Sequence, residues 1–505
     1  MSKGQFTFYL LRLTFAPMPT APFDLRARAR QAALDAGFHP DIPAEVMQET
    51  QRLKQQSQSS PPAGVRDLRS LAWSSIDNDT SRDLDQVEYV ERLADGTLRL
   101  LVGIADVDSL VAKGTSIDRR AQAECTSVYT GVAIFPMLPN DLSTGMTSLL
   151  DEQERLALVI EVRISDSGEV TGHDVFPGLL RNQAKLAYNS TGAWLEGRGP
   201  MPQPLAAVPG MEQQLRLQHE TSQALRGLRK RHGTLTFGSI EATPVVENGE
   251  VKDLTIRGHN AAEDIIESFM VAANVAIARY LKEKNTPSIR RVVKTPRRWD
   301  RIQTLAAGFG VHLPSTPDPK PLSQFLEQRQ AADPDHFPDL SLAIVKLLGP
   351  GEYIVEAPGA EHTGHFGLAT NDYTHSTAPN RRFADLATQR LVKAAVAGVA
   401  EPYALGELST IAAHCTERED AARKVERLMR KVIAANLLRP RIGEIFDGVI
   451  TGASPKGTYV RLKKFPAEGR IVRREHGCDV GDKVRIKLCS VDVGKGFIDF
   501  ERLTD

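Results

Sequence analysis

The spacing of apolar residues predicts a short helical segment near the start of the chain. Residues 24–56 carry Ala and Leu at helical intervals, with a stop at Gly37 and a second helix opening at Pro43. The polar, proline-containing segment QSQSSPPAG (56–64) follows and predicts a linker. Residues 1–63 are therefore expected to form a small helical domain.

The central part of the chain, residues 64–440, combines strand and helix patterns. Alternating apolar and polar residues predict two β-hairpins, at 87–92 with 97–107 and at 156–164 with 170–176. Apolar residues at helical spacing predict helices at 211–232, 260–283, 383–399 and 405–438. Residues 315–340 are rich in Pro and Asp and are expected to form a loop with one short helix. This mixture predicts one large mixed domain.

The last segment, residues 441–505, reads as short strands separated by turns at PKG (455–457) and VGD (480–482). Its length suits a small β-barrel. The expected fold class is therefore α+β, with a helical start, a mixed central domain and a C-terminal barrel.

Composition excludes several classes of protein. No stretch approaches the ~20 uninterrupted apolar residues of a membrane span, and Arg12 interrupts the one apolar run that could suit a signal peptide. The four cysteines form no CxxC pair, so neither a zinc site nor a disulfide framework is predicted. A reducing, cytoplasmic setting without membrane contact is expected.

Overall charge does not indicate a partner, because 63 basic residues balance 63 acidic ones. The distribution is more informative. Basic residues gather at 421–441 and at 288–301, and such clusters can contact phosphates, although solvated helix faces would have the same composition.

The most informative stretch is SIDNDTSRDLDQ (75–86), which places four Asp residues, at positions 77, 79, 83 and 85, within nine residues. Clustered carboxylates repel one another unless a cation offsets their charge. Hard divalent cations such as Mg²⁺ prefer these oxygen ligands. The stretch is therefore either a solvated acidic loop, a calcium loop, or a metal site for phosphoryl transfer.

The calcium interpretation has partial support from spacing. Positions 1, 3, 5, 9 and 12 of a loop counted from Asp77 are Asp77, Asp79, Ser81, Asp85 and Glu88. The sharp turn of such a loop needs Gly at position 6, where this chain has Arg82. The segment after Asp85 also has a strand pattern instead of a helical one, which argues against this interpretation.

Several blocks of sequence together resemble the ribonuclease II family, whose catalytic domain is called RNB. The family pattern of Asp, five residues, Asp, one residue and a pair of Asp is matched by Asp77, Asp83, Asp85 and Gln86. Further blocks follow in the family's order: IADVDSLVAKGTSIDRRA (104–121), SVYTGVAIFPMLPNDLS (127–143), NAAEDIIESFMVAAN (260–274) and YTHSTAPNRRFADLATQR (373–390). The end of the chain is similar to the S-one type of RNA-binding OB fold.

The resemblance implies a 3′-to-5′ hydrolytic exoribonuclease that degrades single-stranded RNA to 5′-nucleoside monophosphates and a short end product, as a monomer. Mg²⁺, or Mn²⁺ in its place, would be held by Asp77, Asp83 and Asp85. Asp85 is the carboxylate expected to be most critical, and Arg381 is expected to contact the scissile phosphate. The residues that the resemblance suggests for RNA binding are Tyr129, Arg382, Glu426, Phe446, Lys456, Tyr459 and Arg461.

The chain departs from the family pattern in three places. Gln86 replaces the second of the paired Asp residues, and a neutral amide binds a metal less strongly than a carboxylate. TPSIRR (286–291) lacks the aromatic residue of the family's second stacking position. The residues before Asp77 are too few for the family's two cold-shock domains, and a short helical domain, such as a helix-turn-helix or winged-helix unit, is expected in their place. Gln86 keeps an alternative open, an RNA-binding protein of the same fold with weakened catalysis.

Overall fold

The computed structural model describes residues 23–56, 62–238, 241–247, 250–334, 336–360, 363–454 and 457–503. A seven-stranded sheet in the order β1-β8-β7-β4-β3-β2-β9 forms its centre. The two outermost pairs, β1 with β8 and β2 with β9, are parallel, and the other pairs are antiparallel. The strands are β1 (Arg66–Asp67), β2 (Ser74–Asp77), β3 (Gln86–Arg92), β4 (Leu98–Ala105), β7 (Glu154–Ile164), β8 (Val170–Arg181) and β9 (Ala184–Ala187).

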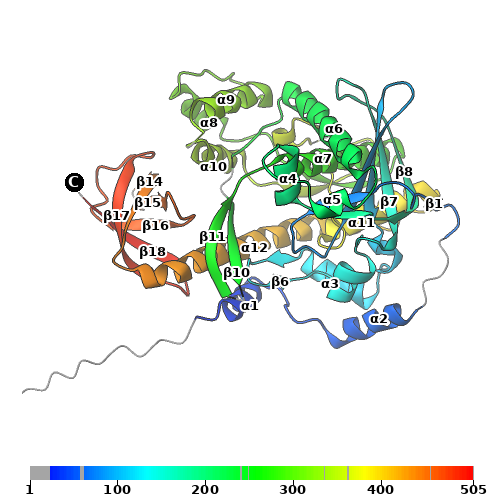
Figure 1. Ribbon diagram of the computed structural model, residues 1–505, viewed down its shortest axis with the longest axis horizontal. Coiled ribbons are helices and arrows are strands. Elements are labelled where there is room, and N and C mark those ends of the chain that lie inside the picture. Colours follow the sequence, from blue (N-terminus) through cyan, green and yellow to red (C-terminus); the bar gives the residue numbers. More distant parts are fainter. Residues whose placement is uncertain are drawn as a thin grey trace, which may run out of the picture.

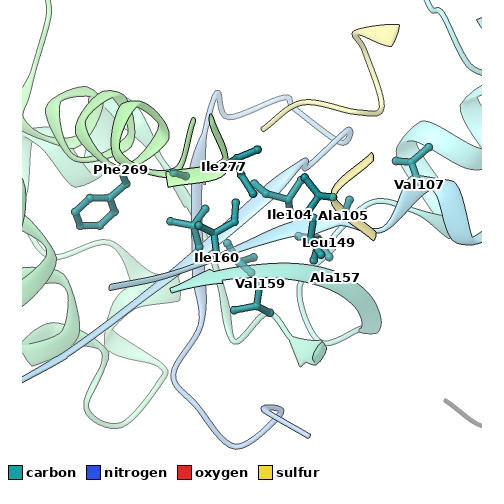
Figure 2. Packing of buried hydrophobic residues seen from close by; sticks show 14 of the residues in the cluster. Ile104, Ala105, Val107, Leu149, Ala157, Val159, Ile160, Phe269 and Ile277 are labelled. Atoms are coloured by element: carbon teal, nitrogen blue, oxygen red, sulfur yellow. The ribbon is translucent and has the colours of Figure 1, made fainter. Parts of the chain in front are cut away.

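Two long helices, α6 (Met211–His232) and α7 (Ala261–Glu283), pack against this sheet and against each other. Figure 2 shows Phe269 and Ile277 of α7 close to Ile160 and Ile104 of the sheet. All four side chains are fully buried. Burial of apolar surface contributes about 25 cal/mol per Å² to the free energy of folding. The packing of α6 and α7 therefore stabilises the sheet and the loops at its ends.

Both predicted hairpins and all four predicted helices of the central region are confirmed. The hairpins are β3–β4 and β7–β8, and the two remaining helices are α11 (Phe383–Ala397) and α12 (Leu405–Leu438). The prediction for residues 315–340 is wrong, because two helices occupy this region, α9 (Pro319–Ala332) and α10 (Phe337–Leu348). Proline is tolerated in the first turn of a helix, where its missing N–H has no partner to lose, so these prolines begin helices instead of breaking them.

The start of the described chain consists of α1 (Leu25–Asp35) and α2 (Ala44–Gln55). Ala29, Ala32 and Phe38 belong to one apolar cluster with residues of α12, and α2 packs against α3 (Ser116–Glu124). No strand lies within the described residues before 64. The two predicted helices are confirmed, and they share their core with the central domain.

The C-terminal part forms a closed five-stranded barrel in the order β14-β15-β16-β18-β17. Figure 1 shows this barrel at one end of the molecule, connected to the central domain by the long α12. Arg461 of β15 donates two hydrogen bonds, of 2.6 and 3.0 Å, to the carboxylate of Asp339 in α10, which ties the barrel to the central domain. The barrel strands are β14 (Ile445–Ser454), β15 (Gly457–Leu462), β16 (Glu468–Arg473), β17 (Lys483–Asp492) and β18 (Phe497–Arg502).

The remaining elements are short. They are β5 (Val128–Tyr129), β6 (Ile134–Phe135), β10 (Glu241–Glu247), β11 (Glu250–Arg257), β12 (Ser288–Val292), β13 (Glu352–Glu356), α4 (Tyr188–Leu195), α5 (Gln203–Ala206), α8 (Trp299–Ala307), a π-helical turn at Leu142–Met146, and 3₁₀ turns at Val107–Ser109, Phe366–Leu368 and Arg439–Arg441. Among the described residues, no helix is both long and apolar enough to cross a bilayer.

Part of the basic cluster at 288–301 lies inside the protein. Arg290 is 1% exposed and donates a 2.7 Å hydrogen bond to Glu356, and Arg291 is paired with Glu419 at 2.7 Å. Neither a phosphate contact nor a solvated helix face, which is the favoured interpretation of this cluster taken alone, describes these two arginines. Both face inward because β12 is buried along its whole length.

Replacing Arg290 by Met is expected to lower the free energy of unfolding by about 3–5 kcal/mol, because removal of one partner of a buried ion pair leaves the other charge uncompensated. Chemical denaturation measures this change. The exposed Arg297→Met, in the same segment, is the control. Equal destabilisation by the two substitutions would contradict the prediction.

Candidate functional site

A cavity of about 1380 Å³ opens where the loop between β2 and β3 faces β5, the turn before α11, and α12. Its lining combines acidic, aromatic and basic side chains. Those used below are Asp79, Asp83, Tyr129, Asn380, Glu426 and Arg430. The loop from Asp77 to Asp85 thus places two of its carboxylates, Asp79 and Asp83, on the wall of this space.

Asp85 lies just behind this wall and is only 1% exposed. Its Oδ1 accepts a 3.0 Å hydrogen bond from the backbone N–H of Asn380. Its Oδ2 lies 3.3 Å from Arg381 Nε and has no hydrogen-bond partner in the described part of the chain. Burial raises the pKa of Asp85 to about 7, although Arg381 acts in the opposite direction. Asp85 is therefore a buried carboxylate with one oxygen available to a further ligand.

Arg381 is fixed by the backbone on both sides. Its carbonyl accepts a 3.0 Å hydrogen bond from Ser127 N, and Phe383 N donates to the carbonyl of Cys125 at 2.8 Å. The side chain of Arg381 keeps 45% of its surface exposed. Partial removal from water lowers the pKa of Arg381, but the charge of Asp85 outweighs this effect and raises it. Arg381 is thus a permanent cation held beside Asp85 and still partly open to a ligand.

Tyr129 connects the acidic loop to α12. Its hydroxyl donates a 3.0 Å hydrogen bond to Asp83, and its backbone N–H donates a 3.1 Å bond to Glu426. Burial raises the pKa of the Tyr129 phenol, and the charges of Asp83 and Asp85 act in the same direction while Arg381 opposes them, so the phenol stays protonated. Tyr129, Asp83 and Glu426, which were predicted as site residues from separate blocks of sequence, therefore lie in direct contact.

The remaining loop carboxylates differ in their surroundings. Asp77 ends β2, and its Oδ1 accepts hydrogen bonds from the Asn78 backbone at 2.7 Å and from the Ser81 hydroxyl at 3.0 Å. Asp79 is exposed. Asp77 is thus held in place at the end of a strand, whereas Asp79 faces solvent in the cavity.

The donor atoms of this site fit a hard divalent cation. Asp77, Asp83 and Asp85 offer carboxylate oxygens, and Asp85 Oδ2 lacks a hydrogen bond among the described residues. Glu88 on β3 is fully buried, and neither of its carboxylate oxygens has a hydrogen-bond partner in the described ranges. Burial, with a contribution from Asp77, raises the pKa of Glu88 well above its ordinary value. Buried acceptors of this kind call for a proton or a cation.

A second group of possible ligands, His259, Asp264 and Glu267, brings its donor atoms within 4.8 Å of one another. Arginines already compensate this group. Arg226 is paired with Asp264, and Arg229 lies 3.7 Å from Glu267. These ion pairs account for the cluster without a metal.

Sequence reasoning missed two residues beside the acidic loop as parts of the site, Tyr188 and Asn380. Burial, then the charges of Asp77 and Glu88, raises the pKa of the Tyr188 phenol. Asn380 acts through its backbone N–H, which no side-chain pattern reveals. A lone Tyr at the junction of β9 and α4 carries no signal in the sequence.

The other predicted RNA-binding residues lie apart from the loop or are already paired. Arg382 is bound to Asp385 by hydrogen bonds of 2.8 and 2.6 Å. In the barrel, Tyr459 is 39% exposed, whereas Phe446 packs edge-on against Phe500. Arg461 is engaged by Asp339. Lys456 lies outside the described residues. Their RNA-binding roles stay predictions.

The sheet with the acidic loop at its end forms a large mixed domain that is joined to an OB-like barrel. The RNB domain model matches residues 65–398, and the model for the C-terminal S1 domain of RNase II-type exonucleases matches residues 444–503. Since the first match covers more than half of the chain, the protein belongs to the RNB-domain family.

Comparison with individual proteins agrees with this assignment. The chain is 28% identical over 500 residues to ribonuclease R of Escherichia coli, and the match covers 92% of this chain and 60% of that protein. The chain thus spans about three fifths of the length of this relative.

Solved structures show the same fold. RNase R of Mycoplasma genitalium, solved with ribose-methylated single-stranded RNA, aligns with a TM-score of 0.85 at 22% identity, covering 95% of this chain and 78% of that one. Yeast Ssd1, described as a pseudonuclease, aligns with a TM-score of 0.69 at 17% identity, covering 91% of this chain and 57% of that one. The fold alone therefore does not decide between catalysis and binding.

Proposed function

We propose that this protein is a hydrolytic 3′-to-5′ exoribonuclease that degrades single-stranded RNA to 5′-nucleoside monophosphates and a short end product. The observation that carries the proposal is Asp85, a buried carboxylate with a hydrogen-bond-free oxygen beside Arg381, in the same loop as the cavity-lining Asp83. Family membership and the likeness to ribonuclease R support the reaction class.

The acidic loop would hold Mg²⁺, for which Mn²⁺ can substitute, through Asp77, Asp83 and Asp85. When bound, the metal would activate the attacking water and neutralise charge on the phosphate and the leaving oxygen. The rest of the chemistry belongs to groups of the chain. The Arg381 side chain lies beside Asp85 and is partly exposed, and a guanidinium can bind two phosphate oxygens in parallel. The Asn380 N–H keeps Asp85 in one orientation.

Tyr129 and Glu426 would position the 3′-terminal nucleotides. The Tyr129 ring lines the cavity, and its hydroxyl is anchored on Asp83. Stacking on an aromatic ring tolerates any base. Glu426 also lines the cavity, where a carboxylate can accept a hydrogen bond from a ribose 2′-hydroxyl and so favour RNA over DNA. Arg430 adds positive charge to the same wall.

The direction of attack and the product test this proposal. An unstructured linear RNA should be shortened stepwise from its 3′ end, with 5′-nucleoside monophosphates as the main product by chromatography. The same sequence closed into a circle should resist, because it has no end. Cleavage of the circle at a rate equal to that of the linear RNA would rule out an exonuclease.

Tyr129→Ala is expected to leave longer final fragments than the wild type, because loss of stacking, worth about 1–3 kcal/mol per base, weakens the hold on short RNA. Tyr129→Phe keeps the ring and loses only the hydrogen bond to Asp83, so its end product should match that of the wild type. Denaturing gels of exhaustive digests measure the fragment length. An unchanged end product for Tyr129→Ala would show that another group sets it.

A second candidate function is RNA binding without catalysis, and Gln86 is the observation that favours it. This residue is 6% exposed at the start of β3 and supplies a neutral amide beside Asp85. Protection of a 3′-labelled RNA from other nucleases, without any shortening of that RNA, would support this alternative.

The setting of the protein is part of the same proposal. We place it in the cytoplasm, acting as a monomer on single-stranded RNA without a membrane. The four cysteines, which are all free thiols in the structure, suit a reducing compartment. Size-exclusion chromatography with light scattering tests the monomer.

A further inference from the structure

A buried carboxylate next to the acidic loop has no function in the mechanism described so far. Glu88 is 0% exposed on β3. Neither of its carboxylate oxygens has a hydrogen-bond partner in the described part of the chain, and the ion pairs found among these residues do not include it. A structural role for a buried acid would require such partners. The side chain therefore needs either a proton or a positively charged ligand as its partner.

The position of Glu88 relates it to the acidic loop. Residues two apart on a strand point to the same face of the sheet, so Glu88 and Gln86 share one face of β3. Glu88 is paired in register with Ser74 of β2, the strand that ends in Asp77. The charges of Asp77, Glu88 and Arg381 all act on the phenol of Tyr188. Glu88 therefore lies on the face of β3 that carries Gln86, and it is close enough to Asp77 and Tyr188 for their charges to interact.

We propose that Glu88 supplies the negative charge that the neutral Gln86 does not. In this arrangement Asp77, Asp83 and Asp85 bind the divalent cation, and the buried charge of Glu88 strengthens its attraction to the site. This inference rests on the proposed metal-dependent hydrolysis. Glu88 acts as a positioning residue: it does not touch the RNA, and it adds attraction for the cation from the buried side of the site. Such supporting carboxylates typically contribute 10- to 100-fold to metal affinity.

Calorimetric titration of the metal-free full chain with MgCl₂ tests the proposal without using activity. Glu88→Gln is expected to weaken Mg²⁺ binding by about 10- to 100-fold. Glu161→Gln is the matched control, since Glu161 is a buried carboxylate of the same sheet that is paired with Arg99 at 2.9 Å. Its affinity for Mg²⁺ should equal that of the wild type.

A compensating substitution provides the second measurement. Gln86→Asp in the Glu88→Gln background should return Mg²⁺ affinity to about the wild-type level, because the charge of the site is restored. In EDTA, Glu88→Gln should unfold at a temperature no lower than the wild type, because it removes an unpaired buried carboxylate. Unfolding at a clearly lower temperature would show a structural role and overturn the proposal.

Two results separate this inference from the proposed function. Wild-type protein that binds Mg²⁺, together with a Glu88→Gln variant of equal affinity, would overturn the role of Glu88 alone. Wild-type protein that binds neither Mg²⁺ nor Mn²⁺ would overturn both.

Discussion

Asp85→Asn is expected to slow RNA hydrolysis by about 10³-fold or more while the protein still binds RNA. The carboxylate is fully enclosed, held by Asn380 and next to Arg381, so an amide of the same shape keeps the fold and removes the charge. Electrostatic stabilisation by a bound cation contributes several kcal/mol to the transition state, and each 1.36 kcal/mol is about tenfold in rate. Single-turnover degradation of a labelled RNA measures the loss.

Asp79→Asn is the matched control, because Asp79 belongs to the same loop but is exposed. It should retain activity close to that of the wild type. Equal losses in the two variants would mean that the overall charge of the loop matters and that Asp85 has no special place in it.

The pH dependence of the stability of Asp85→Asn gives an independent test of the buried carboxylate. The pKa of Asp85 is about 7 in the folded protein, against an ordinary 3.8. The stability that goes with its protonated form is fully present below about pH 4 and is lost as pH rises through 7. In EDTA at pH 8, Asp85→Asn should therefore unfold at a higher temperature than the wild type, and the difference should shrink toward pH 4.

Arg381→Ala is expected to lower kcat by about 10²- to 10³-fold. The reason is that the substitution removes a hydrogen-bond donor to the charge that develops on the phosphate in the transition state. KM for long RNA should change less, because most contacts along the strand remain. Arg381→Lys should recover only part of kcat, since an ammonium lacks the planar fork that binds two phosphate oxygens. Steady-state kinetics on a homopolymer separates the two parameters.

The outcome that contradicts this role is a rise in KM with kcat unchanged. That result would place Arg381 among the groups that bind RNA equally in the ground state and in the transition state.

Most of the secondary structure followed from local patterns. The amphipathic helices α6, α7 and α12 and the hairpins β3–β4 and β7–β8 each bury one continuous face or row of apolar side chains, and such periodicity is visible in a single sequence. Residues 315–340 were misjudged because Pro319 and Pro338 stand in the first turns of α9 and α10, where proline favours a helix.

The site was predictable only through blocks that lie far apart in the chain. Asp85 and the Asn380–Arg381 turn are nearly 300 positions apart, with a sequence separation of 295 between the hydrogen-bonded Asp85 and Asn380. No local pattern links them. Glu88 occupies a polar position of an alternating strand, which normally faces solvent. Only the packing around β3 shows that this carboxylate is enclosed.

The central claim is that the acidic loop remains a working catalytic site despite Gln86. A time course on a 5′-labelled, unstructured RNA tests it most directly, with metal-free wild-type protein before and after addition of Mg²⁺. The expected result is a ladder that shrinks from the 3′ end only after Mg²⁺ is added. Tight binding of the RNA with no shortening, in Mg²⁺ or in Mn²⁺, would contradict the claim and identify an RNA-binding protein of the same fold.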